Sequence, residues 1–109
     1  MTVFLVETYV IKPEKQEQYM ALMKKWVAYI KKNKEKCKEV KSWKLFSQMI
    51  GGNTGGYVEM GEFASLADYE KFMKRTFHGQ EEFFKTIVSG FTSCVVPGTY
   101  SMNAWNSIM

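Results

Sequence analysis

Three ionisable side chains in this chain could do chemistry: Glu7, Glu59 and His78. Glu7 interrupts the apolar segment 3–11, and Glu59 lies in the strand-like segment 57–63. A carboxyl group in a half-buried strand is costly unless it is paired or faces a cavity. Two such groups on neighbouring strands could share a proton, or bind a cationic or hydroxylated ligand. We therefore treat these three side chains as candidate catalytic residues.

Each candidate also has a structural interpretation. Lys41 or Lys44 could pair with the two glutamates, or the carboxylates could lie at a solvated rim of the sheet. His78 could transfer protons in a pocket, because an imidazole can do so near neutral pH. Equally, it could be an exposed residue beside Gly79 at a helix kink. Because the chain has one histidine and its two cysteines form no CxxC pair, we expect no metal site.

An aromatic ligand pocket is the second candidate feature. Its predicted lining is Tyr19, Trp26, Phe72 and Phe83, which lie on two segments with helical spacing. Aromatic stripes at this spacing are more often part of a packed core. Two alternatives follow: a cleft lined by these rings, or a filled core.

The elements that position these residues follow from the periodicity of the apolar side chains. Residues 3–11 are rich in β-branched and aromatic residues and predict a strand. Apolar residues at three- and four-residue spacing predict a helix from about residue 14 to the low thirties. Residues 40–50 and 57–63 predict a hairpin of two strands, joined by the glycine-rich segment 51–56.

A second helix follows the hairpin. Ser65 and Asp68 have the spacing of a capping box, which predicts a helix start. The predicted helix is interrupted at His78, resumes over residues 81–89, and ends with Gly90 as its C-cap.

A last strand is predicted in two parts, 93–96 and 99–105, which Pro97 and Gly98 separate. The order is therefore β-α-β-β-α-β, in a single domain over residues 1–109 without a linker. The simplest fold class for this order is α+β. It is a ferredoxin-like, four-stranded antiparallel sheet with both helices on one face.

The first strand also predicts a partner subunit. Its residues are apolar on both faces, with Leu5 and Tyr9 on one and Phe4 and Val6 on the other. Helices cover only one face of this kind of sheet, so the second face needs another cover. We expect a homodimer that is built sheet against sheet.

The charged residues exclude several classes of partner. The 15 basic residues exceed the 11 acidic residues and give a net charge of +4, but Arg75 is the only arginine. Bidentate recognition of bases or phosphates is therefore excluded as a main function. Acidic residues interrupt the lysine-rich segment 31–44, which favours a solvated helix end over a nucleic-acid site. Segment 51–56 is no phosphate loop but a hairpin loop and candidate lid.

Localisation follows from equally simple signals. No apolar run approaches the roughly 20 residues that a bilayer-spanning helix needs, and no secretory signal is recognisable. Cys37 and Cys94 lie in dissimilar surroundings, which predicts reduced thiols. We expect a cytoplasmic protein with no membrane and no nucleic-acid partner.

The chain contains three segments, ETYVIKPEKQEQY, KSWKLF and GGYVEMGEFASLADYEKF, that resemble the dimeric α/β-barrel superfamily. The resemblance is greatest to its antibiotic-biosynthesis-monooxygenase and NIPSNAP-like branches, and it extends over essentially the whole chain. It implies that two ferredoxin-like subunits pair into a barrel, with a small ligand between helices and sheet. Members include cofactor-free monooxygenases, haem-degrading enzymes and muconolactone-type isomerases, so the fold does not select one activity.

The haem-degrading branch is not matched at its functional positions. That branch uses an Asn on the first strand, and a Trp and a His on the second helix. The corresponding residues here are Glu7, Phe72 and Glu82. His78 is offset from the histidine position by about one helical turn. We therefore expect no haem and no other cofactor.

The leading prediction is a homodimeric α/β-barrel protein that binds a small apolar or aromatic organic ligand between helices and sheet. As an enzyme it would be a cofactor-independent monooxygenase or a related isomerase, in which Glu7, Glu59 and His78 ionise the substrate. The alternative is a non-catalytic structural or assembly module with a filled core. A cleft of roughly 300 Å³ or more with convergent polar atoms would distinguish the two.

Overall fold

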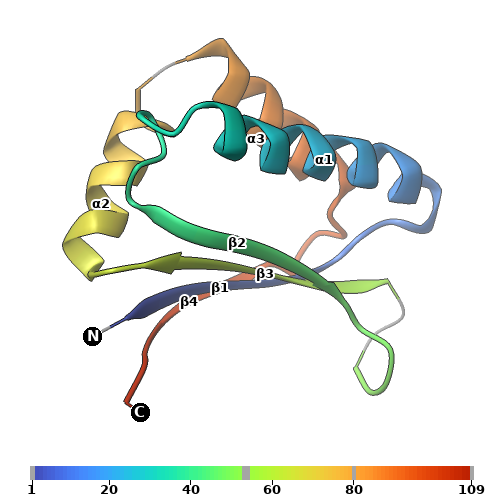
Figure 1. Ribbon diagram of the computed structural model, residues 1–109. Coiled ribbons are helices and arrows are strands. Elements are labelled where there is room, and N and C mark those ends of the chain that lie inside the picture. The colour runs from blue at the N-terminus through green and yellow to red at the C-terminus, as the bar shows by residue number, and fades with distance from the viewer. Residues whose placement is uncertain (1, 53–54, 80, 109) are drawn as a thin grey trace.

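The computed structural model describes residues 2–52, 55–79 and 81–108, which form one sheet and one layer of helices (Figure 1). The strands are β1 (Val3–Val10), β2 (Val40–Ser47), β3 (Gly56–Phe63) and β4 (Ser101–Asn106). All pairings are antiparallel, in the order β2-β3-β1-β4. The helices are α1 (Gln16–Lys32), α2 (Leu66–Arg75) and α3 (Glu82–Cys94), and a 3-10 turn, η1 (Pro13–Lys15), precedes α1. The predicted α+β, ferredoxin-like fold class is confirmed.

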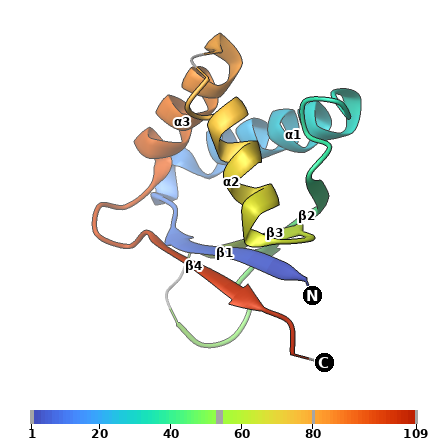
Figure 2. The same cartoon turned by 90° about the vertical axis from the view of Figure 1, so that its left-hand side faces the viewer.

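The helices all lie on the same face of the sheet, as the view in Figure 2 shows. Side chains alternate between the two faces of a strand. In β1, Leu5 and Tyr9 point toward the helices and are buried in two separate hydrophobic clusters. One cluster surrounds Trp26 of α1, and the other surrounds Tyr19 at the start of the same helix. Helix α1 therefore packs along the sheet and contributes to both clusters.

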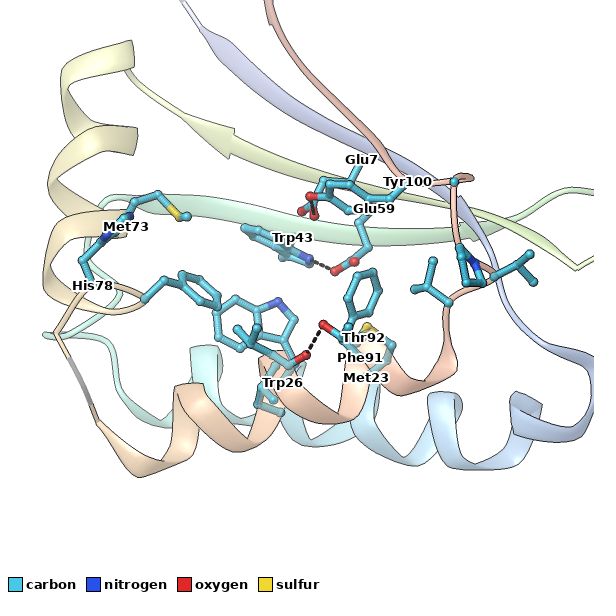
Figure 3. A pocket seen from close by; sticks show the side chains of 17 residues that line it. Glu7, Met23, Trp26, Trp43, Glu59, Met73, His78, Phe91, Thr92 and Tyr100 are labelled. Carbon is cyan, nitrogen blue, oxygen red and sulfur yellow. Dashed lines mark hydrogen bonds between the residues drawn. The ribbon is translucent and has the colours of Figure 1, made fainter.

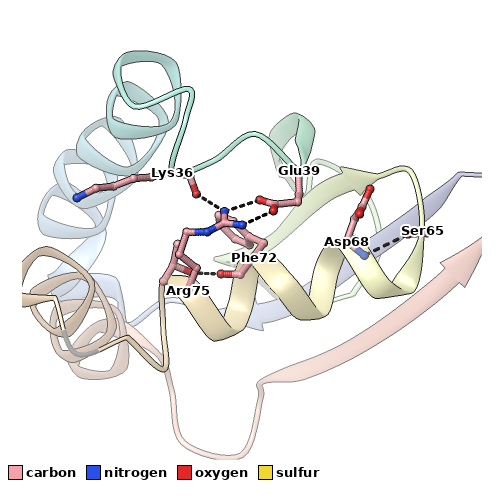
Figure 4. A network of polar contacts seen from close by, with 7 residues as sticks. Lys36, Glu39, Ser65, Asp68, Phe72 and Arg75 are labelled. Atoms are coloured by element: carbon pink, nitrogen blue, oxygen red, sulfur yellow. Dashed lines mark hydrogen bonds and ion pairs between the residues drawn. The ribbon is translucent and has the colours of Figure 1, made fainter.

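Polar contacts at both ends fix helix α2 (Figure 4). At its start, the hydroxyl of Ser65 accepts a hydrogen bond from the backbone N–H of Asp68 at 3.1 Å, as the capping pattern predicts. At its end, the guanidinium of Arg75 donates to both carboxylate oxygens of Glu39 and to the carbonyl oxygen of Lys36. These hydrogen bonds hold the pKa of Glu39 below its ordinary value. Arg75 thus ties α2 to the segment between α1 and β2.

The predicted interruption of the second helix is real, but its predicted end is wrong. Helix α2 ends at Arg75 and α3 begins at Glu82, so His78 lies in the connection between them. Gly90 is not a C-cap, because α3 continues to Cys94. A Cβ atom at Gly90 would lie 3.1 Å from Cδ1 of Leu22 in α1. The glycine therefore allows α1 and α3 to approach closely.

The first part of the predicted last strand, residues 93–96, is also wrong. Its β-branched residues are typical of a strand, yet helical hydrogen bonding continues to Cys94. Val95 forms only an isolated bridge with Ile11, and the N–H of Val96 donates to the carbonyl oxygen of Val10 at 2.9 Å. The chain then turns at Gly98, whose φ is 84°, and enters β4.

The sheet face opposite the helices, which we call the open face, carries apolar side chains from all four strands. Register places Val6 beside Met60 of β3, Phe4 beside Trp105 of β4, and Phe46 of β2 beside Val58. Phe46 and Trp105 are 48% and 57% exposed. Among the described residues, no helix covers this face.

Candidate functional site

A cavity of about 650 Å³ lies between the sheet and the helices (Figure 3). Strands β1, β2 and β3, all three helices and the two segments that flank α3 contribute to its wall. Val88 of α3 and Tyr100 are exposed members of this wall, so the side between α3 and β4 borders solvent. The volume exceeds the roughly 300 Å³ at which ligand pockets begin.

The sheet register brings the two predicted carboxyl groups together in this cavity. Glu7 of β1 and Glu59 of β3 are direct cross-strand partners, and both line the cavity wall. Side chains at such positions have Cβ atoms about 4.5–5.5 Å apart, and like charges there destabilise the fold. Figure 3 shows both carboxyl groups with Tyr100 beside them.

Glu59 is held by two hydrogen bonds. It is only 5% exposed. The indole Nε1–H of Trp43 donates to its Oε1 at 2.9 Å, and the hydroxyl of Tyr9 donates to its Oε2 at 2.8 Å. Burial raises the pKa of Glu59, and the two hydrogen bonds oppose that rise. Because an indole N–H can only donate, this arrangement favours the carboxylate form on Glu59.

The side-chain partner of Glu7 among the described residues is the hydroxyl of Tyr100, which donates to its Oε2. Burial, followed by the negative charge of Glu59, raises the pKa of Glu7 from 4.5 to about 7, against the hydrogen bond from Tyr100. A carboxyl group with such a pKa can take up or release a proton near neutral pH. Glu7 is therefore the better placed of the two for proton transfer.

Two buried tyrosines extend the hydrogen bonding behind Glu59. The hydroxyls of Tyr9 and Tyr19 are 2.5 Å apart, so Glu59, Tyr9 and Tyr19 form a chain. Burial raises the pKa of both tyrosines, and the charge of Glu59 raises it further. Both hydroxyls therefore keep their protons and serve as hydrogen-bond donors.

Of the four aromatic residues predicted to line a pocket, the structure places one in the wall of this cavity. Trp26 lines the cavity. Tyr19 and Phe72 do not, because both are fully buried in the two hydrophobic clusters. Phe83 does not either, because its ring stacks on Tyr29 with centroids 4.0 Å apart.

Several aromatic residues of the wall were not among the predicted site residues. They come from β2, from the segment before β4, from α3 and from the α2–α3 connection: Trp43, Tyr100, Phe91 and Phe77. One signal was available for Trp43, because it alternates with Leu45 on one face of a predicted strand. Its neighbour in the register is Gly61, where a Cβ atom would lie 2.6 Å from Cζ3 of Trp43. The ring occupies the space that this glycine leaves.

His78 lines the same cavity but lies apart from the carboxyl pair. It belongs to the α2–α3 connection, is exposed, and lies beside Met73 at the other end of the cavity in Figure 3. The three candidate catalytic residues therefore line one cavity, in which Glu7 and Glu59 are adjacent and His78 is distant from them.

None of the described residues that form the cavity wall is Lys or Arg. Glu7 and Glu59 consequently form no ion pair with Lys41 or Lys44 in the described chain, and their partners are tyrosine and tryptophan. This leaves two carboxyl groups as the main source of charge in the cavity.

The described ranges contain neither a candidate metal site nor a candidate membrane-spanning helix. No group of three or more His, Cys, Asp or Glu side chains there could bind a metal ion. Within those same ranges, no helix has both the length and the apolar character needed to cross a membrane. Asn53 and Thr54 of the predicted lid lie outside the described residues.

Comparison with known proteins finds similarity in structure but not in sequence. No protein-family model matches the chain, and no curated protein matches it by sequence. It is similar to a Caulobacter crescentus protein assigned as an antibiotic biosynthesis monooxygenase, with a TM-score of 0.74 and 16% identity over 99% of this chain and 91% of that one. It is similar to a NIPSNAP family protein from Agrobacterium tumefaciens, with a TM-score of 0.72 and 13% identity over 97% and 92%. It is also similar to SnoaB, a cofactor-independent oxygenase from Streptomyces nogalater, with a TM-score of 0.71 and 8% identity over 99% and 94%.

At these sequence identities the likeness is one of fold, and a fold does not determine an activity. The resemblance predicted from the three sequence segments is confirmed at that level. This chain has the ferredoxin-like α+β fold that is found in structures of antibiotic biosynthesis monooxygenase-like and NIPSNAP proteins.

Proposed function

We propose that this protein binds a small, mostly apolar organic molecule in the cavity and exchanges a proton with it through Glu7. The observation that carries the proposal is the cross-strand pair of Glu7 and Glu59 facing a cavity of about 650 Å³. A large apolar pocket with a few convergent polar groups is the usual form of a small-molecule site. The same cavity argues against the alternative of a structural module with a filled core.

Each polar group has a distinct proposed role. Glu7 takes a proton from the ligand or returns it, because its pKa of about 7 suits both steps. Glu59 is held in place by hydrogen bonds from Trp43 and Tyr9, and its negative charge adds to the effect of burial in raising the pKa of Glu7. His78, at the other end of the cavity, is proposed as a second proton-transfer group for a ligand that extends that far.

The more specific activity that we propose is that of a cofactor-independent monooxygenase. The support is the likeness in fold to a cofactor-independent oxygenase from Streptomyces nogalater. In such a reaction the protein base removes a proton, and the electron-rich substrate then reduces dioxygen. One oxygen atom enters the product and the other leaves as water. The protein need supply only an apolar chamber and a base, as the cavity and Glu7 would do.

Ligand binding and turnover can be tested separately with phenols and quinols. A ligand at a hundredfold its dissociation constant should stabilise the folded protein by about 2.7 kcal/mol, which a thermal-shift assay detects. With a ligand so identified, Glu7→Gln should lower the rate of oxygen consumption by about a hundredfold or more, because a positioned base is lost.

The matched control for this assay is Glu62→Gln. Glu62 is on the same strand as Glu59 but accepts a hydrogen bond from Ser42 on the open face. The control should consume oxygen at the rate of the unaltered protein. Equal rates in Glu7→Gln and in the unaltered protein would contradict the role of Glu7.

We further propose that a second copy of the chain covers the open face. Val6, Val58 and Met60 of this face are apolar, and the large side chains of Phe46 and Trp105 are exposed beside them. Exposed large apolar side chains that are grouped on one face are typical of an interface between subunits. Pairing by a two-fold axis would place two such sheets face to face.

The dimer should dissociate when a charge is placed on the open face. Trp105→Asp is expected to give a folded monomer, because Trp105 is 57% exposed in the single chain and its replacement leaves the core intact. Light scattering after size-exclusion chromatography would measure the mass, and circular dichroism would verify folding. Leu66→Asp, at an exposed residue of α2 away from this face, should remain dimeric. A monomeric unaltered protein would refute the interface.

A further inference from the structure

The charge of the cavity wall is opposite to that of the chain as a whole. The chain carries a net charge of +4. Among the described residues of the wall, the charged side chains are acidic, and they are the adjacent pair Glu7 and Glu59. An anionic ligand such as a fatty acid or a phosphorylated cofactor would meet two carboxyl groups and, among the described residues of the wall, neither a lysine nor an arginine. The wall therefore selects against anions.

The rest of the wall is rich in aromatic rings. Five line the cavity: Trp26, Trp43, Phe77, Phe91 and Tyr100. The face of such a ring attracts a cation that lies within about 6 Å of its centroid, and tryptophan does so most strongly. Figure 3 shows Trp43 and Tyr100 beside the carboxyl pair, with Trp26 and Phe91 across the cavity. A cation at the carboxyl pair would thus have rings around it.

Trp26 adds an unused hydrogen-bond donor. Its side chain is only 2% exposed and lines the cavity, and among the described residues its indole N–H has no hydrogen-bond partner. That nitrogen is nevertheless not sealed within protein, because no fully buried side-chain nitrogen or oxygen in the described chain is left without a partner. The N–H therefore opens into the cavity and is free for an acceptor atom of a ligand.

We infer that the ligand of this cavity is an organic cation, a primary or secondary amine that is protonated at neutral pH and carries an aromatic or apolar body. Its ammonium group lies at Glu7 and Glu59, and a hydrogen-bond acceptor on its body can take the N–H of Trp26. The inference rests on the proposed ligand-binding function and names its ligand class. It does not depend on oxygenase chemistry.

The balance of charge explains why an amine fits better than an alcohol of the same shape. Two carboxylates on adjacent strands repel each other, and an ammonium group between them replaces that repulsion by two attractions. A hydroxyl group can donate one hydrogen bond to the pair but leaves the repulsion in place. Because Glu59 is buried and Glu7 is half-buried, solvent screens these charges less than on the surface.

Binding of an amine should also be coupled to the release of protons from the protein. The titratable groups that face Glu7 are Glu59 on β3, Tyr100 before β4 and Tyr69 on α2, with His78 at the other end of the cavity. An ammonium group favours the ionised form of Glu7. Binding near neutral pH should therefore release part of a proton, and the affinity for amines should fall as the pH decreases below about 7.

The test uses probes that share a body and differ in charge. Tryptamine, tryptophol and indole-3-acetate have the same indole ring with an ammonium, a hydroxyl and a carboxylate group. Corresponding phenyl and naphthyl series extend the range of body size. Calorimetry at about pH 7.5 should give at least about tenfold tighter binding for the amine than for the alcohol, and the weakest binding for the carboxylate.

Two variants of the intact chain make the test specific. Glu7→Gln should reduce the affinity for amines by about tenfold or more and leave that for alcohols nearly unchanged. Glu62→Gln removes the same charge from the open face and should leave both affinities unchanged. Calorimetry in two buffers of different ionisation enthalpy should show proton release near pH 7 and none near pH 9.

The outcomes separate this inference from the proposed function. If alcohols bind as tightly as amines in every series, the inference is overturned and the proposed ligand site stands. Tighter binding of carboxylates would also overturn it. If no member of any series binds or raises the melting temperature, both the ligand class and the ligand site are refuted.

Discussion

Replacing Glu7 with Gln is expected to raise the melting temperature of the protein above pH 7 and to leave it unchanged below about pH 4.5. The folded protein raises the pKa of Glu7 from 4.5 to about 7, through burial and the charge of Glu59. Between these values the unfolded chain releases a proton that the folded chain retains, so stability decreases as the pH rises. Glutamine resembles the protonated acid and does not ionise, so the variant does not lose stability in this way as the pH rises.

The expected size of the effect follows from the pKa. A rise from 4.5 to about 7 corresponds to roughly 3 kcal/mol at most. Even a third of that would change the melting temperature of a domain this size by about 4 °C or more. Thermal unfolding followed by circular dichroism between about pH 4 and pH 9 would measure the difference.

The control for this experiment is Glu35→Gln, because Glu35 is an exposed residue between α1 and β2 that lies outside the cavity wall and the open face. Its melting curve should follow that of the unaltered protein at every pH. Other groups that face Glu7 are Glu59, Tyr100 and Tyr69, and they remain in both variants. If the melting temperatures of Glu7→Gln and the unaltered protein differ by the same amount at every pH, folding does not raise the pKa of Glu7.

Gly61→Ala should destabilise the protein and weaken ligand binding at once. A Cβ atom at this position would lie 2.6 Å from Cζ3 and 2.8 Å from Cε3 of the Trp43 ring. The ring must move, and with it the N–H that donates to Glu59. Overpacking of this kind costs about 1–3 kcal/mol. Loss of the hydrogen bond also frees Glu59, so we expect ligand affinity to fall by about tenfold.

The variant Trp43→Phe separates the loss of stability from the loss of ligand affinity. It removes the N–H but leaves Gly61 and the space beside it unchanged, so it should weaken ligand binding without the cost of overpacking. Denaturant unfolding measures the free energy of unfolding of both variants. Titration with any ligand found for the cavity measures their ligand affinity. A Gly61→Ala protein with unchanged stability and affinity would show that Trp43 has room to move.

Local signals were enough to predict most of the fold. The apolar residues of β1, the three- and four-residue spacing of α1 and the glycine-rich hairpin depend on neighbours in sequence. The end of α3 was predicted wrongly because it depends on a distant contact. Gly90 has the residue type of a helix C-cap, but it packs against Leu22 in another helix.

Of the candidate site, only the two carboxyl groups could be predicted from the sequence. Glu7 and Glu59 are conspicuous in the sequence because acidic residues are unusual in apolar strands. The sheet register then makes them cross-strand partners. Their hydrogen-bond partners were not predictable, because Trp43 and Tyr100 reach them from other elements. Helical spacing shows which residues point inward. It does not show which of those meet a cavity, so Trp26 could not be separated from Tyr19.

The pairing of β1 also has a consequence for the kinetics of folding. β2 and β3 can pair across one short loop, but Val3 of β1 must find Phe63 and then Asn106. Contacts between residues so distant in sequence form slowly, because closing long loops costs chain entropy. The carboxyl pair and its contact with Tyr100 thus assemble after the local hairpin. We therefore expect their mutual repulsion to act in this slow step, where it slows folding as well as speeding unfolding.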